Sequence, residues 1–323
     1  MVSRDGIQPG QGAAKMRLNR RDFFKAAGMA AATSLVPRAV EGGGGDRLGG
    51  AFGCLVDLTR CIGCRKCEQA CNAVQKLPPP ERPFDDLLVL EKTRRMDSKT
   101  FTVVNRVNTG AVDERGRPVP IFIKLQCMHC LDPACVSACP VGALTRRDNG
   151  AVHYNASRCI GCRYCMVSCP FQVPSYEYED PLTPRVRKCT FCFDQRLAEG
   201  KVPGCIDVCP VEALTFGPRN QLLETARKRI QDDPGRYIRH IYGEKEVGGT
   251  GWLYLSGVSF ERLGFRRLPE RPMPKLPESI QHGLYSYLWA PIVLFGVLGG
   301  IMKSLERKAA GETSDEREEE TRS

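Results

Sequence analysis

Two copies of one short stretch decide the fold: Arg60-Cys-Ile-Gly-Cys-Arg-Lys-Cys67 and Arg158-Cys-Ile-Gly-Cys-Arg-Tyr-Cys165. A fourth cysteine follows each copy, Cys71 in the first and Cys169 in the second, so that both read C-x2-C-x2-C-x3-C. This run is typical of bacterial [4Fe–4S] sites, where a tight loop of three cysteines holds one cluster and the fourth cysteine ligates a neighbouring one. The spacing therefore predicts iron–sulfur ligation at two places in the chain.

Two further groups of four cysteines resemble the first two but have a longer middle interval. An insertion between the second and third ligands can loop outward, so ligation by three cysteines of one loop survives. Cys135-Val-Ser-Ala-Cys-Pro-Val-Gly-Ala-Leu144 is repeated as Cys205-Ile-Asp-Val-Cys-Pro-Val-Glu-Ala-Leu214, which indicates a duplicated two-cluster unit. In chain order the groups are group one (Cys61, Cys64, Cys67, Cys71), group two (Cys127, Cys130, Cys135, Cys139), group three (Cys159, Cys162, Cys165, Cys169) and group four (Cys189, Cys192, Cys205, Cys209).

Zinc and disulfide bonds are the alternative uses for so many cysteines. Paired C-x2-C units also bind tetrahedral zinc, but zinc explains neither the fourth cysteine nor the proline that follows it in groups two to four. Disulfides occur in exported proteins, yet cysteines three apart on tight loops are poor partners for many bridges. The chain of 323 residues is also too long for a scaffold in which bridges replace a core. Four [4Fe–4S] clusters are predicted, with a zinc- or disulfide-stabilised structural anchor as the remote alternative.

The net charge of +10 would usually indicate nucleic acid or an anionic surface as a partner. Residues 1–39 carry +5 and the segment from Lys303 carries −2, which leaves +7 for the body between them. Four thiolate-ligated clusters contribute roughly −8 in total. Because the clusters cancel the charge of the body, no nucleic-acid partner is expected.

The N-terminus has the pattern of an export signal. Asn19-Arg-Arg-Asp-Phe-Phe-Lys25 is a twin-arginine motif, and an apolar run from Ala26 to Val36 follows it. The twin-arginine route passes proteins already folded around cofactors, which suits clusters assembled in the reducing cytoplasm. We therefore predict a signal segment over residues 1–39 and a glycine-rich linker over 40–52 before the folded body.

A membrane anchor is predicted near the C-terminus. Residues 284–302 contain no charged side chain and would span about 28 Å as a helix, close to one hydrocarbon thickness. Lys303, Arg307 and Lys308 follow, which places that side in the cytoplasm by the positive-inside rule. A buried core helix is the alternative. We expect a single-pass protein of the inner membrane with its main domain in the periplasm and a disordered, charged cytoplasmic tail over 303–323.

The predicted fold class is α+β, with duplicated ferredoxin-like modules over residues 53–283 and an inserted layer of strands over 72–126. The strands expected in that layer are Leu87–Glu91, Thr100–Val107 and Pro118–Leu125.

Some residues outside the four groups also receive predictions. Cys54 is expected to be a buried structural thiol in a strand before group one. His129 lies inside the Cys127–Cys130 pair and is expected to donate a hydrogen bond near a cluster, because ligation by histidine would leave a cysteine unused. Basic residues beside the ligands are expected to raise cluster potentials; they are Arg65, Lys66, Lys124, Arg163 and Lys188.

Several segments resemble a known family. The chain is similar to the HybA-type iron–sulfur electron-transfer subunits of membrane-bound [NiFe] hydrogenase-2, within the wider class of four-cluster, ferredoxin-like subunits of respiratory oxidoreductases. The β subunits of formate dehydrogenases share a similar Val247–Thr250 element, so a formate dehydrogenase or another molybdopterin enzyme is the alternative donor. The resemblance is carried by Gln126–Cys130, Cys159–Pro170, Leu197–Phe216, Tyr242–Thr250 and Ile280–Tyr285.

In this class groups one and four interlock, as do groups two and three. The resemblance therefore implies cluster one on Cys61, Cys64, Cys67 and Cys209, cluster two on Cys189, Cys192, Cys205 and Cys71, cluster three on Cys127, Cys130, Cys135 and Cys169, and cluster four on Cys159, Cys162, Cys165 and Cys139. It implies that the first pair of clusters faces the catalytic partner and the second pair faces the membrane.

The resemblance also implies that the subunit is not catalytic by itself. Electrons would come from the small and large subunits of the hydrogenase and leave to an integral-membrane, quinone-reducing subunit. The sequence has no dinucleotide-binding fingerprint and no recognisable group of nucleophile and base, so no catalytic residue is predicted. A full set of sixteen ligands also argues against a self-contained catalytic iron–sulfur enzyme, which needs an incompletely ligated cluster.

Overall fold

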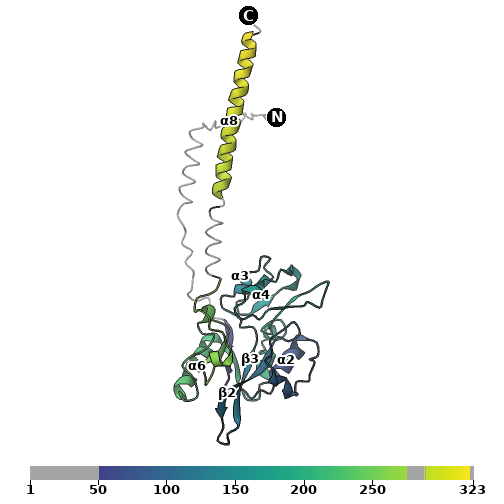
Figure 1. Cartoon of the computed structure of the whole chain (residues 1–323), viewed down its shortest axis with the longest axis vertical. Coiled ribbons are helices and arrows are strands. Elements are labelled where there is room, and N and C mark those ends of the chain that lie inside the picture. The colour runs from purple at the N-terminus through teal and green to yellow at the C-terminus, as the bar shows by residue number, and fades with distance from the viewer. Residues whose placement is uncertain (1–50, 275–286, 288, 321–323) are drawn as a thin grey trace, which may run out of the picture. The chain divides into compact units, whose positions relative to one another are not determined.

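A computed structural model describes residues 51–274, 287 and 289–320 (Figure 1). The predicted export signal over 1–39 and nearly all of the linker over 40–52 lie outside the described residues, as does the first part of the predicted membrane span. In chain order the elements are β1 (Phe52–Asp57), α2 (Lys66–Gln75), η1 (Leu87–Glu91), β2 (Val103–Val112), β3 (Pro118–Leu125), α3 (Ala134–Ser137), β4 (Leu144–Arg146), β5 (Val152–Tyr154), η2 (Ala156–Arg158), α4 (Tyr164–Ser168), β6 (Ser175–Tyr176), β7 (Val186–Arg187), η3 (Leu197–Glu199), α5 (Gly204–Asp207), β8 (Leu214–Pro218), α6 (Arg219–Asp232), η4 (Glu246–Gly248), β9 (Trp252–Leu255), η5 (Phe260–Leu263) and α8 (Trp289–Glu320).

The core of the body is a sheet of three strands in the order β8-β1-β9, in which β1 pairs antiparallel with β8 and parallel with β9. Successive side chains of a strand point to opposite faces. On one face Leu55 and Leu253 pack against Leu222 and Ala226 of α6. The opposite face belongs to a second apolar cluster that includes cysteines of the cluster-binding groups. The sheet therefore separates a supporting helix from the predicted redox sites.

Cys54 lies on this second face, in the middle strand of the sheet. Its side chain is fully buried, and it pairs in register with Phe216 of β8 and Trp252 of β9. The predicted strand before group one is confirmed, with Cys54 as a buried free thiol in it.

Short helices bring the four cysteine groups together in pairs. Helix α2 packs against α5, so the helix of group one meets the helix of group four. Helix α3 packs against α4 in the same way and joins groups two and three (Figure 1). The modules are therefore assembled from segments far apart in the sequence. With the mixed helix and strand content, this arrangement confirms the predicted α+β fold of ferredoxin-like modules.

Proline decides how long these helices are. Helices α3, α4 and α5 each end within two residues of a Cys-Pro pair and contain only four or five residues. A proline cannot continue a helix, because it lacks the backbone N–H and its ring clashes with the preceding turn. Group one has Asn72 in place of the proline, and α2 accordingly continues to Gln75.

The inserted layer differs from its prediction in one of three places. Strand β3 occupies the predicted Pro118–Leu125 and pairs antiparallel with β2, which begins three residues later than predicted and extends to Val112. Leu87–Glu91 was predicted as a strand, and this prediction is wrong because the segment is the 3₁₀ helix η1. The Asp86 carboxylate accepts a hydrogen bond from the backbone N–H of Leu88 at 2.9 Å, which caps a helical turn.

The C-terminal helix is long and apolar enough to cross a membrane over Trp289–Arg307, with a mean hydropathy of 1.3 and no buried residue in that window. The tail from Lys303 was predicted to be disordered, but α8 continues through it to Glu320. Glutamate, arginine, lysine and alanine dominate this segment and have high helix propensity. Adding residues to an existing helix also avoids the cost of nucleation.

The contrast between α2 and the other helices gives a prediction. Asn72→Pro removes a backbone donor from the middle of α2, and we expect it to destabilise the protein by about 3 kcal/mol. Asn72→Ala is the control, because it loses only the side-chain hydrogen bond to the carbonyl of Pro78 and should cost about 1 kcal/mol. Thermal unfolding followed by far-UV circular dichroism measures both. Equal stability of the two variants would contradict this account of helix length.

Candidate functional site

The cysteines of groups one and four line two neighbouring cavities. Four of them surround the first cavity: Cys61, Cys64, Cys67 and Cys209, called quartet one. Four others surround the second: Cys71, Cys189, Cys192 and Cys205, called quartet two. Each cavity therefore takes three cysteines from one chain segment and the fourth from a distant one.

The remaining groups interlock in the same way. Burial, and after it the negative charge of three neighbouring thiols, raises the pKa of Cys130 and raises that of Cys165 to about 11. These neighbours define quartet three (Cys127, Cys130, Cys135, Cys169) and quartet four (Cys139, Cys159, Cys162, Cys165). The four quartets have the same members as the ligand sets that the resemblance implies. That they bind iron stays a prediction.

Burial raises the pKa of several thiols in the quartets. Burial raises the pKa of Cys61 to about 11 and that of Cys135 and Cys189 to about 12. Such thiols are neutral near pH 7 unless a cation lies among them, because a charged sulfur in an apolar site lacks solvation. An iron–sulfur cluster held by these residues would supply that positive charge, and its ligation would release the thiol protons.

Backbone N–H groups point at several of the sulfurs. Ala143 donates to Sγ of Cys139 at 3.2 Å, Gly161 to Sγ of Cys159 at 3.4 Å, and Phe191 to Sγ of Cys189 at 3.5 Å. A thiolate accepts such bonds more strongly than a thiol does. Within residues 51–274 no three Cys, His, Asp or Glu side chains converge closely enough for one metal ion. The donors therefore fit a cluster bound through thiolates.

The four C-x2-C loops share one backbone feature. The residue before the second cysteine has a positive φ in all four loops: 72° at Gly63, 45° at His129, 70° at Gly161 and 61° at Phe191. Glycine adopts this conformation without strain, whereas histidine and phenylalanine do not. The sequence alone gives no sign that His129 and Phe191 share it. Their rings contact each other at a tilt of 35° with centroids 4.7 Å apart, so the two strained loops face each other.

The quartets form a continuous series. Lys124 lines the cavities of both quartet one and quartet two. Cys189 of quartet two and Cys127 of quartet three interact electrostatically, as do Cys135 of quartet three and Cys165 of quartet four. The spacing in the sequence cannot give this order, because it depends on how the two modules pack.

His129 is buried beside the predicted third cluster. Its Nδ1 accepts a hydrogen bond from the backbone N–H of Val152 at 3.0 Å, so its Nε2 carries the proton. That Nε2 is buried and has no partner among the described residues, and the same is true of Nε1 of Trp252. Burial, and after it the charge of Lys188, holds the pKa of His129 well below its ordinary value. This geometry is compatible with the prediction that His129 donates a hydrogen bond toward a cluster. That a cluster sulfur accepts the bond stays a prediction.

The basic residues near the ligands have different environments. Lys124 and Lys188 are buried, whereas Lys66 and Arg163 are exposed. Although burial lowers the pKa of Lys124, the negative charge of nearby cysteines raises it above its ordinary value. Arg65 is buried, but its guanidinium bonds to a carboxylate and to backbone carbonyls of the insertion.

A buried carboxylate that the sequence did not reveal ties the insertion to group one. Glu68 is 3% exposed and forms ion pairs with Arg65 and Arg94. It also accepts a hydrogen bond from the backbone N–H of Val104 in β2 at 2.6 Å. Breaking a buried network of this kind is strongly destabilising. Glu68 therefore fixes the insertion against the loop that carries three cysteines of quartet one.

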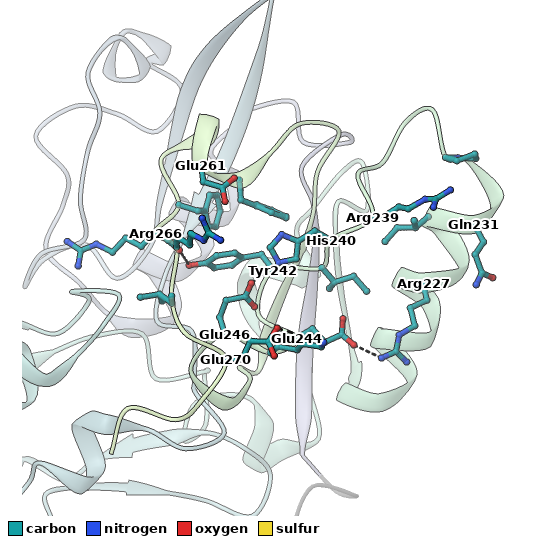
Figure 2. Close-up of a pocket in the computed structure, with 18 residues that line it drawn as sticks. Arg227, Gln231, Arg239, His240, Tyr242, Glu244, Glu246, Glu261, Arg266 and Glu270 are labelled. Atoms are coloured by element: carbon teal, nitrogen blue, oxygen red, sulfur yellow. Dashed lines mark hydrogen bonds and ion pairs between the residues drawn. The ribbon is translucent and has the colours of Figure 1, made fainter. Parts of the chain in front are cut away.

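A larger cavity of about 1010 Å³ lies beside α6 (Figure 2). Some of its charged groups pair with one another, Arg227 with Glu244 and Lys245 with Glu270. The hydroxyl of Tyr242 donates to the carbonyl of Arg266 at 2.9 Å. None of the residues that line it is a cysteine.

Two models of a 4Fe–4S dicluster domain match the chain, over residues 60–143 and 119–219. A protein of Nitratidesulfovibrio vulgaris is 48% identical over 92% of this chain and 80% of its own length. The hydrogenase-2 operon protein HybA of Escherichia coli O157:H7 is 35% identical over 92% of this chain and 98% of its own length. The iron–sulfur subunit of the nitrate-inducible formate dehydrogenase of Escherichia coli K12 is 34% identical over 68% of this chain and 72% of its own length.

The shape of the C-x2-C loops gives a second prediction. A Cβ at Gly63 would lie 2.4 Å from Cδ1 of Phe122, at a φ of 72°. Gly63→Ala therefore adds a steric clash to the cost of a left-handed residue, and we expect it to destabilise by about 3 kcal/mol. Gly116→Ala is the matched control, because Gly116 has a φ of 70° with open space around it and should lose only about 1 kcal/mol. Thermal unfolding compares the two, and a larger loss at Gly116 would refute the argument.

Proposed function

We propose that this chain conducts electrons from a [NiFe] hydrogenase to a quinone-reducing subunit in the membrane. The proposal starts from its family, because the chain belongs to the 4Fe–4S dicluster iron–sulfur subunits that include HybA. The observation that supports this most is the continuous series of four cysteine quartets. Similarity over 98% of the length of HybA, against 72% for the formate dehydrogenase subunit, favours a hydrogenase as the donor.

The chain is an iron–sulfur electron-transfer subunit, and its residues explain why such a subunit needs partners. Iron–sulfur clusters supply reversible one-electron redox chemistry when they are bound. Each quartet offers four sulfurs, so a cubane held by it would have no open position for a substrate. We therefore place hydrogen oxidation on the partner's metal centre. The work of this chain is to hold four redox groups in sequence and to keep water away from them.

The surroundings of quartet two keep water away from its sulfurs. Cys205 and Cys192 are less than 10% exposed, and Phe191 and Trp252 cover the cavity of quartet two. Rigid, apolar surroundings limit the rearrangement of solvent when charge moves. We propose that electrons enter at quartet one, pass quartets two and three, and leave from quartet four toward the bilayer.

The apolar helix supports a location at the membrane. Its window over Trp289–Arg307 has the length and composition of a span. We propose that it anchors the protein in the inner membrane, with the body in the periplasm after twin-arginine export and the charged end in the cytoplasm.

Iron content tests the ligand sets. The holoprotein should contain about sixteen irons per chain, and Cys209→Ala should lose about four of them, because each cubane holds four irons. Cys54→Ala is the matched control, since Cys54 is buried and interacts electrostatically with Cys205, Cys189 and Cys192 but belongs to no quartet. It should keep its full iron content. Loss of iron from Cys54→Ala, or none from Cys209→Ala, would refute the assignment.

Purification of the full chain from membranes with its partners tests the donor. We expect a nickel–iron large subunit and its small subunit to co-purify, together with an integral-membrane protein. Reduction of the bound clusters by hydrogen, followed by electron paramagnetic resonance, is the functional measurement. Recovery of a molybdopterin enzyme instead, with reduction by formate and not by hydrogen, would assign the subunit to a formate dehydrogenase.

A further inference from the structure

Lys124 is a buried cation in β3. Its side chain is 2% exposed. Its ammonium donates to Oγ1 of Thr102 at 2.9 Å and to Oε1 of Gln126 at 2.8 Å, both neutral acceptors. It also lies 4.5 Å from the centroid of the Trp252 ring. In the part of the chain that the structure describes, no aspartate or glutamate forms an ion pair with it.

A charge in this position is costly unless something negative lies nearby. Moving an ammonium out of water into an apolar interior carries a large penalty, which hydrogen bonds to neutral groups offset only in part. The sulfur-bearing side chains nearest to it are those of the two cavities that it lines, among them Cys67 in quartet one and Cys205 and Cys189 in quartet two. The side chain therefore lies between two sets of sulfurs and lines both of their cavities.

We infer that Lys124 is a countercharge shared by the clusters of quartets one and two, and that it raises the reduction potentials of both. The inference rests on the proposed ligand sets. Each reduction adds one negative charge, and a fixed positive charge in a medium of low polarity favours the reduced state. Because one ammonium serves two sites, its removal lowers both potentials together.

A neighbouring lysine provides a matched control. Lys66 precedes Cys67 and also lines the cavity of quartet one, but its side chain is exposed to solvent. Water and salt screen such a charge far more than a buried one. Lys66→Met removes the same charge as Lys124→Met from the lining of the same cavity, but at an exposed position, so the comparison tests the effect of burial.

The test is a redox titration of the purified holoprotein, followed by electron paramagnetic resonance. The signals are first assigned with ligand variants, Cys209→Ala for quartet one and Cys192→Ala for quartet two. In Lys124→Met, which keeps the length of the side chain, we expect the equilibrium constant for reduction of both clusters to fall at least tenfold. For one electron this corresponds to about 59 mV. The clusters of quartets three and four should keep their potentials. Lys66→Met should change the equilibrium constant for reduction of each of the four clusters by less than threefold.

Three results would overturn the inference: no change in Lys124→Met, a change in only one of the two clusters, or an equal change in Lys66→Met. Lys124→Arg keeps the charge, so the equilibrium constants for reduction of both clusters should stay within threefold of the wild-type values. If Lys124→Met loses iron, Lys124→Gln replaces it under the same criterion. A wild-type protein with fewer than four clusters would instead refute the proposed ligand sets, so the two failures are distinguishable.

Discussion

Sulfur buried away from water is the constraint on which the rest of this molecule depends. Several cysteines of the quartets lie in apolar surroundings that disfavour their charged form: burial raises the pKa of Cys61 to about 11 and that of Cys189 to about 12. Three of the helices beside them have only four or five residues. Helices this short are not stable alone. We therefore expect ligation to iron to hold together segments that have little secondary structure of their own.

Each quartet combines cysteines from distant segments of the chain, and this pairing determines how the segments pack. Groups one and four are joined through α2 and α5, and groups two and three through α3 and α4. The pairs then meet where the rings of His129 and Phe191 contact each other. The two domain models match residues 60–143 and 119–219, which overlap in the sequence. The modules in space are different. Groups one and four form one module, and groups two and three, which form the other, lie between them in the sequence.

The sequence predicted those features that depend on local chemistry. Cysteine spacing, the proline after the fourth ligand, β3 and the buried Cys54 could all be identified, since each follows from residue type and interval. Features that depend on tertiary contacts could not. Leu87–Glu91 has the composition of a strand but is a 3₁₀ helix, where Asp86 caps a turn and Arg65 binds nearby carbonyls. The burial of Glu68 could not be predicted, because nothing in the local sequence shows that Arg94 and Val104 contact it.

The parallel pairing of β1 with β9 has a consequence for biosynthesis. Cys54 pairs in register with Trp252, about two hundred residues later in the chain. While the ribosome is still translating the middle of the message, β1 lacks this neighbour and the sheet cannot close. The middle strand of the sheet therefore acquires its second neighbour only after residues 252–255 have been synthesised.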